Sequence, residues 1–90
     1  MDIEFDAVKN ENNLTKHGIT LEDAAAIWGI RVVNIPAGNI DGEKRVKTLG
    51  KIENDVYAVV WTERNGKRRL ISARKATDKE RNLYDGKANH

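Results

Sequence analysis

The sequence predicts an α+β fold, with an antiparallel β-sheet, two N-terminal helices and a short C-terminal helix. Apolar residues recur at helical spacing over residues 21–28, and alternating segments flank an Asn-Gly pair at 65–66, which is the strongest short signal of a β-hairpin. Of the 90 residues, 39% are hydrophobic and 33% are charged. A chain of this size is expected to form one domain over residues 1–90, because its apolar material suffices for a single core.

The first helix is expected between Asp6, a good N-cap, and Gly18, a good C-cap, after a short strand at residues 3–5. Few apolar side chains lie along this helix, so most of its surface is expected to be exposed. Its expected core anchors are Ala7, Val8 and Leu14.

The second helix is expected to start at Thr20, with Asp23 three residues later in a capping-box arrangement, and to end at Gly29. An apolar stripe at positions i, i+3, i+4 and i+7 predicts that one face of this helix packs on the core. The stripe consists of Leu21, Ala24, Ala25 and Trp28.

Two strands are expected next. The β-branched residues of 31–35 predict a strand that ends at Pro36, followed by a loop through Gly42. Residues 45–52 alternate, which predicts a strand with one wet, basic face. That face carries Arg45, Lys47 and Lys51.

The Asn-Gly pair at 65–66 favours a two-residue turn of type I′, in which both central positions need a positive φ. Such a turn pairs Arg64 with Lys67, and uninterrupted pairing then brings Arg74 opposite Tyr57. Both faces of this hairpin are apolar at mid-strand, so the hairpin is expected at the centre of the sheet with both faces covered.

The last helix is expected to begin at a capping box formed by Thr77 and Glu80. It runs through Tyr84, and residues 86–90 are expected to fray. This helix completes the predicted layout.

The composition excludes several kinds of chemistry. Because the chain has no cysteine, it has no disulfide, no cysteine-ligated zinc and no thiol nucleophile, which favours a reducing, cytoplasmic location. The two histidines and the scattered carboxylates lack metal-ligand spacing, and the glycines fit no phosphate-binding fingerprint, so neither a metal nor a cofactor is expected. The apolar runs are too short to cross a membrane.

Positive charge gathers in the second half of the chain. Residues 1–45 carry five Lys/Arg against eight Asp/Glu, whereas residues 46–90 carry eleven against six, and the stretch 64–81 alone has a net charge of +6. A cluster of this density is typical of a surface that binds phosphates, because each neutralised phosphate releases counterions. The alternative is a solvated basic edge that discourages aggregation between strands.

Motifs spread in order over nearly the whole chain resemble those of the BrnT toxin family. The most informative are Lys16-His17-Gly18 and the block Leu-Ile-Ser-Ala-Arg-Lys-Ala at 70–76. The others are Ile-Glu-Phe-Asp at 3–6, Asn13, Glu-Asp-Ala-Ala at 22–25, Asp-Gly-Glu-Lys-Arg at 41–45, Leu-Gly at 49–50, Thr62 with Arg64, and Glu-Arg at 80–81 before Tyr84.

This resemblance implies a RelE-like fold, in which the two N-terminal helices pack on one face of the antiparallel sheet. It also implies a ribonuclease toxin of a type II toxin–antitoxin system, which cleaves RNA without a metal and so arrests translation. The implied partners are the RNA substrate, an antitoxin with a ribbon-helix-helix domain, and the operator DNA that the toxin–antitoxin complex represses.

RNA cleavage without a metal needs cations around the phosphate, and arginine suits this task because its planar fork donates paired hydrogen bonds and stays charged. Arg74 and Lys75 close the last strand beside the expected N-terminus of the last helix, which also favours an anion, so the phosphate is expected there. Arg64 is expected roughly 23 Å away, at the other end of the hairpin, where it would hold other RNA or the antitoxin. A surface salt bridge, such as Arg68 with Glu63, is the alternative for each arginine.

The remaining candidates each have a structural alternative. A histidine titrates near neutral pH, so His17 is a candidate acid or base, although a capping role at the helix end explains it equally well. Lys16 is either a phosphate contact or solvated, Glu80 is either the capping-box partner or a base, and Tyr84 is either a core residue or a platform for base stacking. The expected catalytic residues are therefore Arg74, Lys75, Arg64, His17 and Glu80, and the expected RNA-binding residues are Arg45, Lys16, Arg69, Arg81 and Tyr84.

Two further hypotheses use the same basic surface. The protein could be a non-catalytic nucleic-acid-binding module, which would bind RNA in a salt-sensitive way without cleaving it. It could also be a structural subunit that docks an acidic partner protein and has no affinity for RNA.

Overall fold

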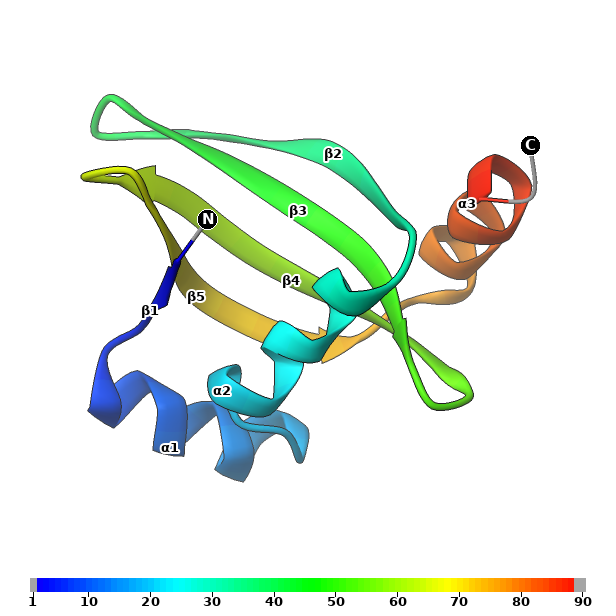
Figure 1. Cartoon of the computed structure of the whole chain (residues 1–90), viewed down its shortest axis with the longest axis horizontal. Coiled ribbons are helices and arrows are strands. Elements are labelled where there is room, and N and C mark those ends of the chain that lie inside the picture. Colours follow the sequence, from blue (N-terminus) through cyan, green and yellow to red (C-terminus); the bar gives the residue numbers. More distant parts are fainter. Residues whose placement is uncertain (1, 89–90) are drawn as a thin grey trace.

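The structure is a computed structural model that describes residues 2–88. It confirms the predicted α+β class, with helices at the start and end of the chain and four long strands between them (Figure 1). The elements are β1 (Ile3–Glu4), α1 (Ala7–His17), α2 (Leu21–Ala24), the 3₁₀ helix η1 (Ala25–Gly29), β2 (Val32–Ile40), β3 (Glu43–Ile52), β4 (Asp55–Arg64), β5 (Lys67–Lys75) and α3 (Asp78–Ala88).

The five strands form one sheet in the order β1-β5-β4-β3-β2. Strands β2 to β5 are antiparallel neighbours, as predicted. The short strand β1 instead runs parallel to β5, so the sheet is mixed rather than purely antiparallel. The pattern at residues 3–5 could show a strand but not its partner, and a strand separated from its neighbour by most of the chain has the connection length that parallel pairing needs.

One face of the sheet is covered by α2 and η1, which pack on Val59, Trp61 and Leu70 (Figure 1). The predicted cap of the second helix is confirmed, because the Thr20 hydroxyl accepts a hydrogen bond from the Asp23 amide at 3.0 Å. The helix does not continue regularly to Gly29 as expected but tightens into η1 from Ala25 onward. The tighter winding buries Ile27 completely, a position outside the predicted stripe.

The opposite face carries α3. Tyr84 of this helix packs with Leu49, Val56 and Ala58, and because neighbouring strand residues point to opposite sides, Ala58 faces away from Val59 and the N-terminal helices. The predicted capping box is confirmed: the Thr77 amide donates to Glu80 Oε1 at 2.9 Å, and the Glu80 amide donates to Thr77 Oγ1 at 3.2 Å.

Helix α3 extends farther than the sequence indicated. It continues to Ala88, so the expected fraying is wrong for residues 86–88. Residues 89 and 90, which the same expectation covered, lie outside the described residues.

The ends of α1 are capped as predicted. Asp6 Oδ1 accepts hydrogen bonds from the amides of Val8 (2.9 Å) and Lys9 (3.0 Å), and Gly18 closes the helix with a φ of 76°. The expected apolar anchors are wrong, however. Ala7 is exposed, Val8 is 65% exposed and Leu14 is 50% exposed.

Asn13 is the residue that attaches α1 to the sheet. Its side chain is buried, and its Nδ2 donates to the carbonyl oxygens of Ile19 (2.7 Å) and Ala73 (2.8 Å), while its Oδ1 accepts from the Ala73 amide (3.0 Å). The amide therefore pairs with β5 as a neighbouring strand would, beyond the point where β1 stops. Hydrogen bonds to a strand edge, rather than apolar burial, fix the position of this helix.

Strand β2 does not end at Pro36 as expected. It continues to Ile40, with an irregularity in its pairing to β3 between Pro36 and Asn39. A proline is tolerated here because β2 lies at the edge of the sheet and the irregularity spares the missing N–H.

The hairpin of β4 and β5 follows the predicted register only near its turn. Arg64 pairs with Lys67 and Trp61 with Leu70, but Val60 then pairs with Ser72, so Ile71 is an extra residue in β5. Beyond this β-bulge every partner is shifted by one position, and residues of β5 change face. The expected pairing of Arg74 with Tyr57 is therefore wrong.

Replacing Gly50 by alanine is expected to destabilise the fold by about 2 kcal/mol, because an overpacked core forces its neighbours to move. A Cβ at Gly50 would lie 2.6 Å from Ile27 Cβ and 3.2 Å from Ile27 O, where η1 rests directly on β3. Urea unfolding measures the effect. Gly29→Ala is the matched control, since its Cβ would meet no atom within 4 Å; equal stability of the two variants would contradict this close approach.

Candidate active site

The β-bulge brings together three charged side chains from three elements: Lys47 of β3, Arg74 of β5 and Glu80 of α3. Because Arg74 pairs with Ala58 and Lys47 with Val60, both cations lie on the face of the sheet that α3 covers in part. Arg74 Nη1 lies 2.7 Å from Glu80 Oε1, and Lys47 Nζ lies 2.7 Å from Glu80 Oε2. We call these three residues the Glu80 cluster.

The carboxylate of Glu80 is saturated with hydrogen bonds. Both guanidinium Nη atoms of Arg74 donate to it, at 2.7 and 3.0 Å, and Lys47 and the Thr77 amide donate as well. The Arg74 hydrogen bond, helped by those from Lys47 and Thr77, holds the pKa of Glu80 far below its usual value. The same bond raises the pKa of Arg74. Glu80 is therefore ionised and is a poor proton acceptor, which favours its capping role over its role as a base.

Two cations and a backbone N–H converge on the two oxygens of one carboxylate, so the structure shows for Arg74 the salt bridge that the sequence left as its alternative role. Donors of these kinds also suit a phosphate oxyanion. The cluster is only partly covered: the side chain of Arg74 is 38% exposed and that of Lys47 is 25% exposed, against 10% for Glu80. The side chains of Arg74 and Lys47 are thus more accessible to solvent than the carboxylate is.

Two other expected arginines share this face of the sheet but lie elsewhere on it. Arg64 is engaged by Glu43, with Nη2 to Oε2 at 2.8 Å, at the turn end of β4. Ala58, opposite Arg74, is six residues from Arg64, or roughly 20 Å. Arg45 pairs with Thr62 on the same face, and its Nε is buried with no hydrogen-bond partner among the described residues.

Lys75 is not brought to the cluster. It pairs with Tyr57 on the opposite face of the sheet, and its Nζ lies 3.6 Å from Asp55 Oδ2. Arg69 lies 3.7 Å from Glu4 at the β1 edge, and Arg81 is exposed on α3. Arg74 and Lys75, although adjacent in sequence, do not share an anion site.

Lys16 and His17 lie in a groove between α1 and β5, which we call the α1–β5 groove. Both side chains are exposed at the last turn of α1. The groove has a volume of about 300 Å³. Its lining residues are Lys9, Asn12, Asn13, Lys16, His17, Ile71 and Ser72.

Tyr84 occupies the core rather than the surface. It is 6% exposed, and its hydroxyl donates to the carbonyl oxygen of Arg31 at 3.0 Å, which ties α3 to the start of β2. The sequence left two roles for Tyr84, in the core or as a stacking platform, and the structure shows it in the core. A buried ring has no exposed face on which an RNA nucleobase could stack.

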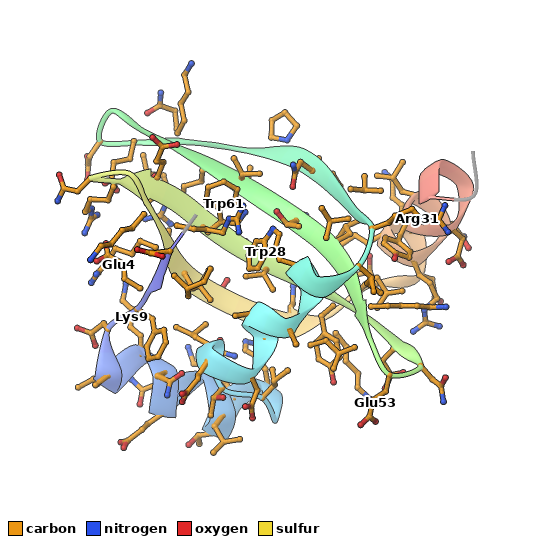
Figure 2. The ribbon with its side chains drawn as sticks, viewed as in Figure 1. Glu4, Lys9, Trp28, Arg31, Glu53 and Trp61 are labelled. Carbon is orange, nitrogen blue, oxygen red and sulfur yellow. The ribbon has the colours of Figure 1, made fainter. Side chains whose placement is uncertain are left out.

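Arg68 does not pair with Glu63, although the two residues lie opposite each other in the hairpin. Its guanidinium instead stacks on Trp28 and Trp61, 4.1 and 4.7 Å from the ring centroids. Figure 2 shows these two rings next to each other between η1 and the sheet, with centroids 6.2 Å apart. Burial lowers the pKa of Arg68. The guanidinium of Arg68 thus packs against the core and does not point toward a phosphate site.

Lys47 is the member of the cluster that sequence reasoning missed as a site residue. The alternation over residues 45–52 placed Lys47 on the basic face of its strand, but nothing in the sequence indicated that this strand lies next to Glu80.

Two comparisons bear on the identity of the chain. The model of a family described as the ribonuclease toxin BrnT of type II toxin–antitoxin systems matches residues 5–80. No curated protein matches the chain. Over residues 2–88, no three His, Asp or Glu side chains gather to hold a metal ion, and no helix is long and apolar enough to cross a membrane.

Proposed function

This chain belongs to the BrnT family of ribonuclease toxins of type II toxin–antitoxin systems, and on that premise we propose that it cleaves RNA without a metal ion at the Glu80 cluster. Membership of the family implies an antitoxin partner. The convergence of Arg74 and Lys47 on one pair of oxygens is the observation that carries the proposal.

In this mechanism the 2′-hydroxyl oxygen of the RNA loses its proton to solvent water and attacks the neighbouring phosphorus, and the bond to the 5′-oxygen breaks. The departing 5′-oxygen takes a proton from solvent, so the products are a 2′,3′-cyclic phosphate and a 5′-hydroxyl. Negative charge builds up on the non-bridging oxygens, where Arg74 and Lys47 stabilise it. Glu80 positions both cations, since it binds each of them in a fixed geometry. Charge stabilisation and positioning supply most of the rate, because neither needs a side chain that changes its protonation state.

Cleavage is expected to continue in excess chelator. A single-stranded RNA is incubated with the purified toxin in EDTA, and the fragments are resolved by gel electrophoresis. Cleavage that stops in EDTA and returns with Mg²⁺ would contradict the metal-free mechanism. RNA that is bound with a steep salt dependence but never cut would instead favour the non-catalytic binding module.

The antitoxin of this system is proposed to carry a ribbon-helix-helix domain, through which the complex binds operator DNA, and the toxin is proposed to arrest translation in the cytoplasm. Expression of the toxin alone should stop growth, and co-expression of the neighbouring gene should restore it. A neighbouring gene that encodes no ribbon-helix-helix protein would overturn the assignment of the antitoxin.

A further inference from the structure

The α1–β5 groove is basic on one side and has no acidic lining among the described residues. Lys9 and Lys16 are seven residues apart, two turns of α1, so they project from the same side of this helix. Within residues 2–88 neither lysine forms an ion pair, unlike Arg64, Arg69, Arg74 and Lys47. Figure 2 labels Lys9 on α1. These charges are therefore available to an anionic ligand.

The walls of the groove are held in place without a ligand. Asn13 joins α1 to β5 through the three hydrogen bonds described above, and Asn10 Oδ1 accepts from the Glu22 amide at 3.0 Å, which ties α1 to α2. Gly18 turns the chain away directly after His17. A rigid groove loses little conformational entropy when a ligand binds.

Ser72 connects the groove to the Glu80 cluster. It lines the groove, and because it pairs with Val60 it lies on the same face of the sheet as Lys47 and Arg74. Ser72 and Arg74 are two residues apart on β5, or roughly 7 Å, so one extended strand of RNA could reach both. The bulge at Ile71 is what brings Ser72 to this face.

We propose that the α1–β5 groove is a second RNA subsite, which binds the nucleotide next to the phosphate that is cleaved. This inference rests on the proposed function, since it extends the path of the same RNA. Lys16 and Lys9 bind the backbone phosphate, and Asn12 and Ser72 donate hydrogen bonds to the ribose. The volume of about 300 Å³ lies at the small end of ligand sites and suits one nucleotide rather than a folded partner.

Binding is tested with a short single-stranded 2′-O-methyl RNA, which cannot be cleaved because its 2′-oxygen is blocked. Fluorescence anisotropy gives the dissociation constant of the wild type and of Lys16→Gln over a range of salt concentrations. Loss of one phosphate contact is expected to make the slope of log K against log salt shallower by about 0.7. Lys16→Glu is expected to weaken binding further.

Lys67→Gln is the matched control, because it removes one exposed lysine at the β4–β5 turn, away from the groove. Thermal unfolding checks that each variant is folded. If Lys16→Gln and Lys67→Gln shift affinity and slope equally, the groove is not a subsite, whereas cleavage by the wild type would leave the proposed function intact. If the wild type neither binds nor cleaves RNA, the proposed function fails and the subsite with it.

Discussion

Replacement of Arg74 by alanine is expected to lower the rate of RNA cleavage about 10²- to 10³-fold, the usual cost of removing one preorganised donor to a developing oxyanion. The loss is expected in kcat more than in KM, because the guanidinium binds the charge that builds up during the reaction. Single-turnover cleavage of a labelled RNA measures it. The fold should survive, since Glu80 keeps Lys47 and the Thr77 amide as partners.

Arg64→Ala is the matched control for this experiment. Like Arg74, Arg64 is an arginine paired with a carboxylate, in this case Glu43, and its side chain is similarly accessible, but it lies at the far end of the hairpin. Its loss is expected to change the rate by less than about tenfold, as for a remote contact to the RNA backbone. Equal rates for wild type and Arg74→Ala would remove Arg74 from the mechanism, and equal losses for the two variants would show only a general effect of charge.

Turns and helix caps were predicted correctly from this sequence, because each is specified by one or two residues of a suitable type. The turn at 65–66, the caps at Asp6, Gly18 and Thr20, and the capping box of Glu80 were all predicted and are all present. Each depends on a backbone angle or a hydrogen bond within a few residues, so distant parts of the chain cannot change it.

The β-bulge at Ile71 could not be predicted in this way, and it decides the site. One extra residue in β5 moves Arg74 to the face of Lys47 and Glu80, and a bulge is chosen by packing across the whole sheet rather than by a residue that favours it. The attachment of α1 escaped prediction for a related reason. A buried asparagine does not belong to a pattern of apolar residues, so the sequence does not reveal that it is buried. The hydrogen bonds of Asn13 depend on the free edge of β5, sixty residues away.

Replacement of Glu80 by glutamine is expected to destabilise the fold by about 3 kcal/mol at neutral pH. The substitution removes the charged acceptor of Arg74 and Lys47, and the Glu80 side chain is only 10% exposed. The pKa of Glu80 is lower in the folded protein than its ordinary value of 4.5. Its contribution is therefore fully present above pH 4.5 and is lost as the pH falls below that value. The stability difference between wild type and variant should shrink accordingly in acid.

Urea unfolding across this pH range measures that difference, and Glu63→Gln, an exposed glutamate on β4, should stay within about 0.5 kcal/mol of the wild type throughout. The cleavage rate separates the two roles of Glu80. Loss of a general base would lower the rate about 10²- to 10⁴-fold, whereas loss of a positioning residue is expected to lower it less than that, because Arg74 and Lys47 remain charged. RNA affinity should not fall, since the variant lacks a negative charge beside the phosphate. A loss of cleavage rate as large as that of a general base, with unchanged stability, would indicate that Glu80 acts as the base. It would contradict the proposal that Glu80 only positions Arg74 and Lys47 for the phosphate.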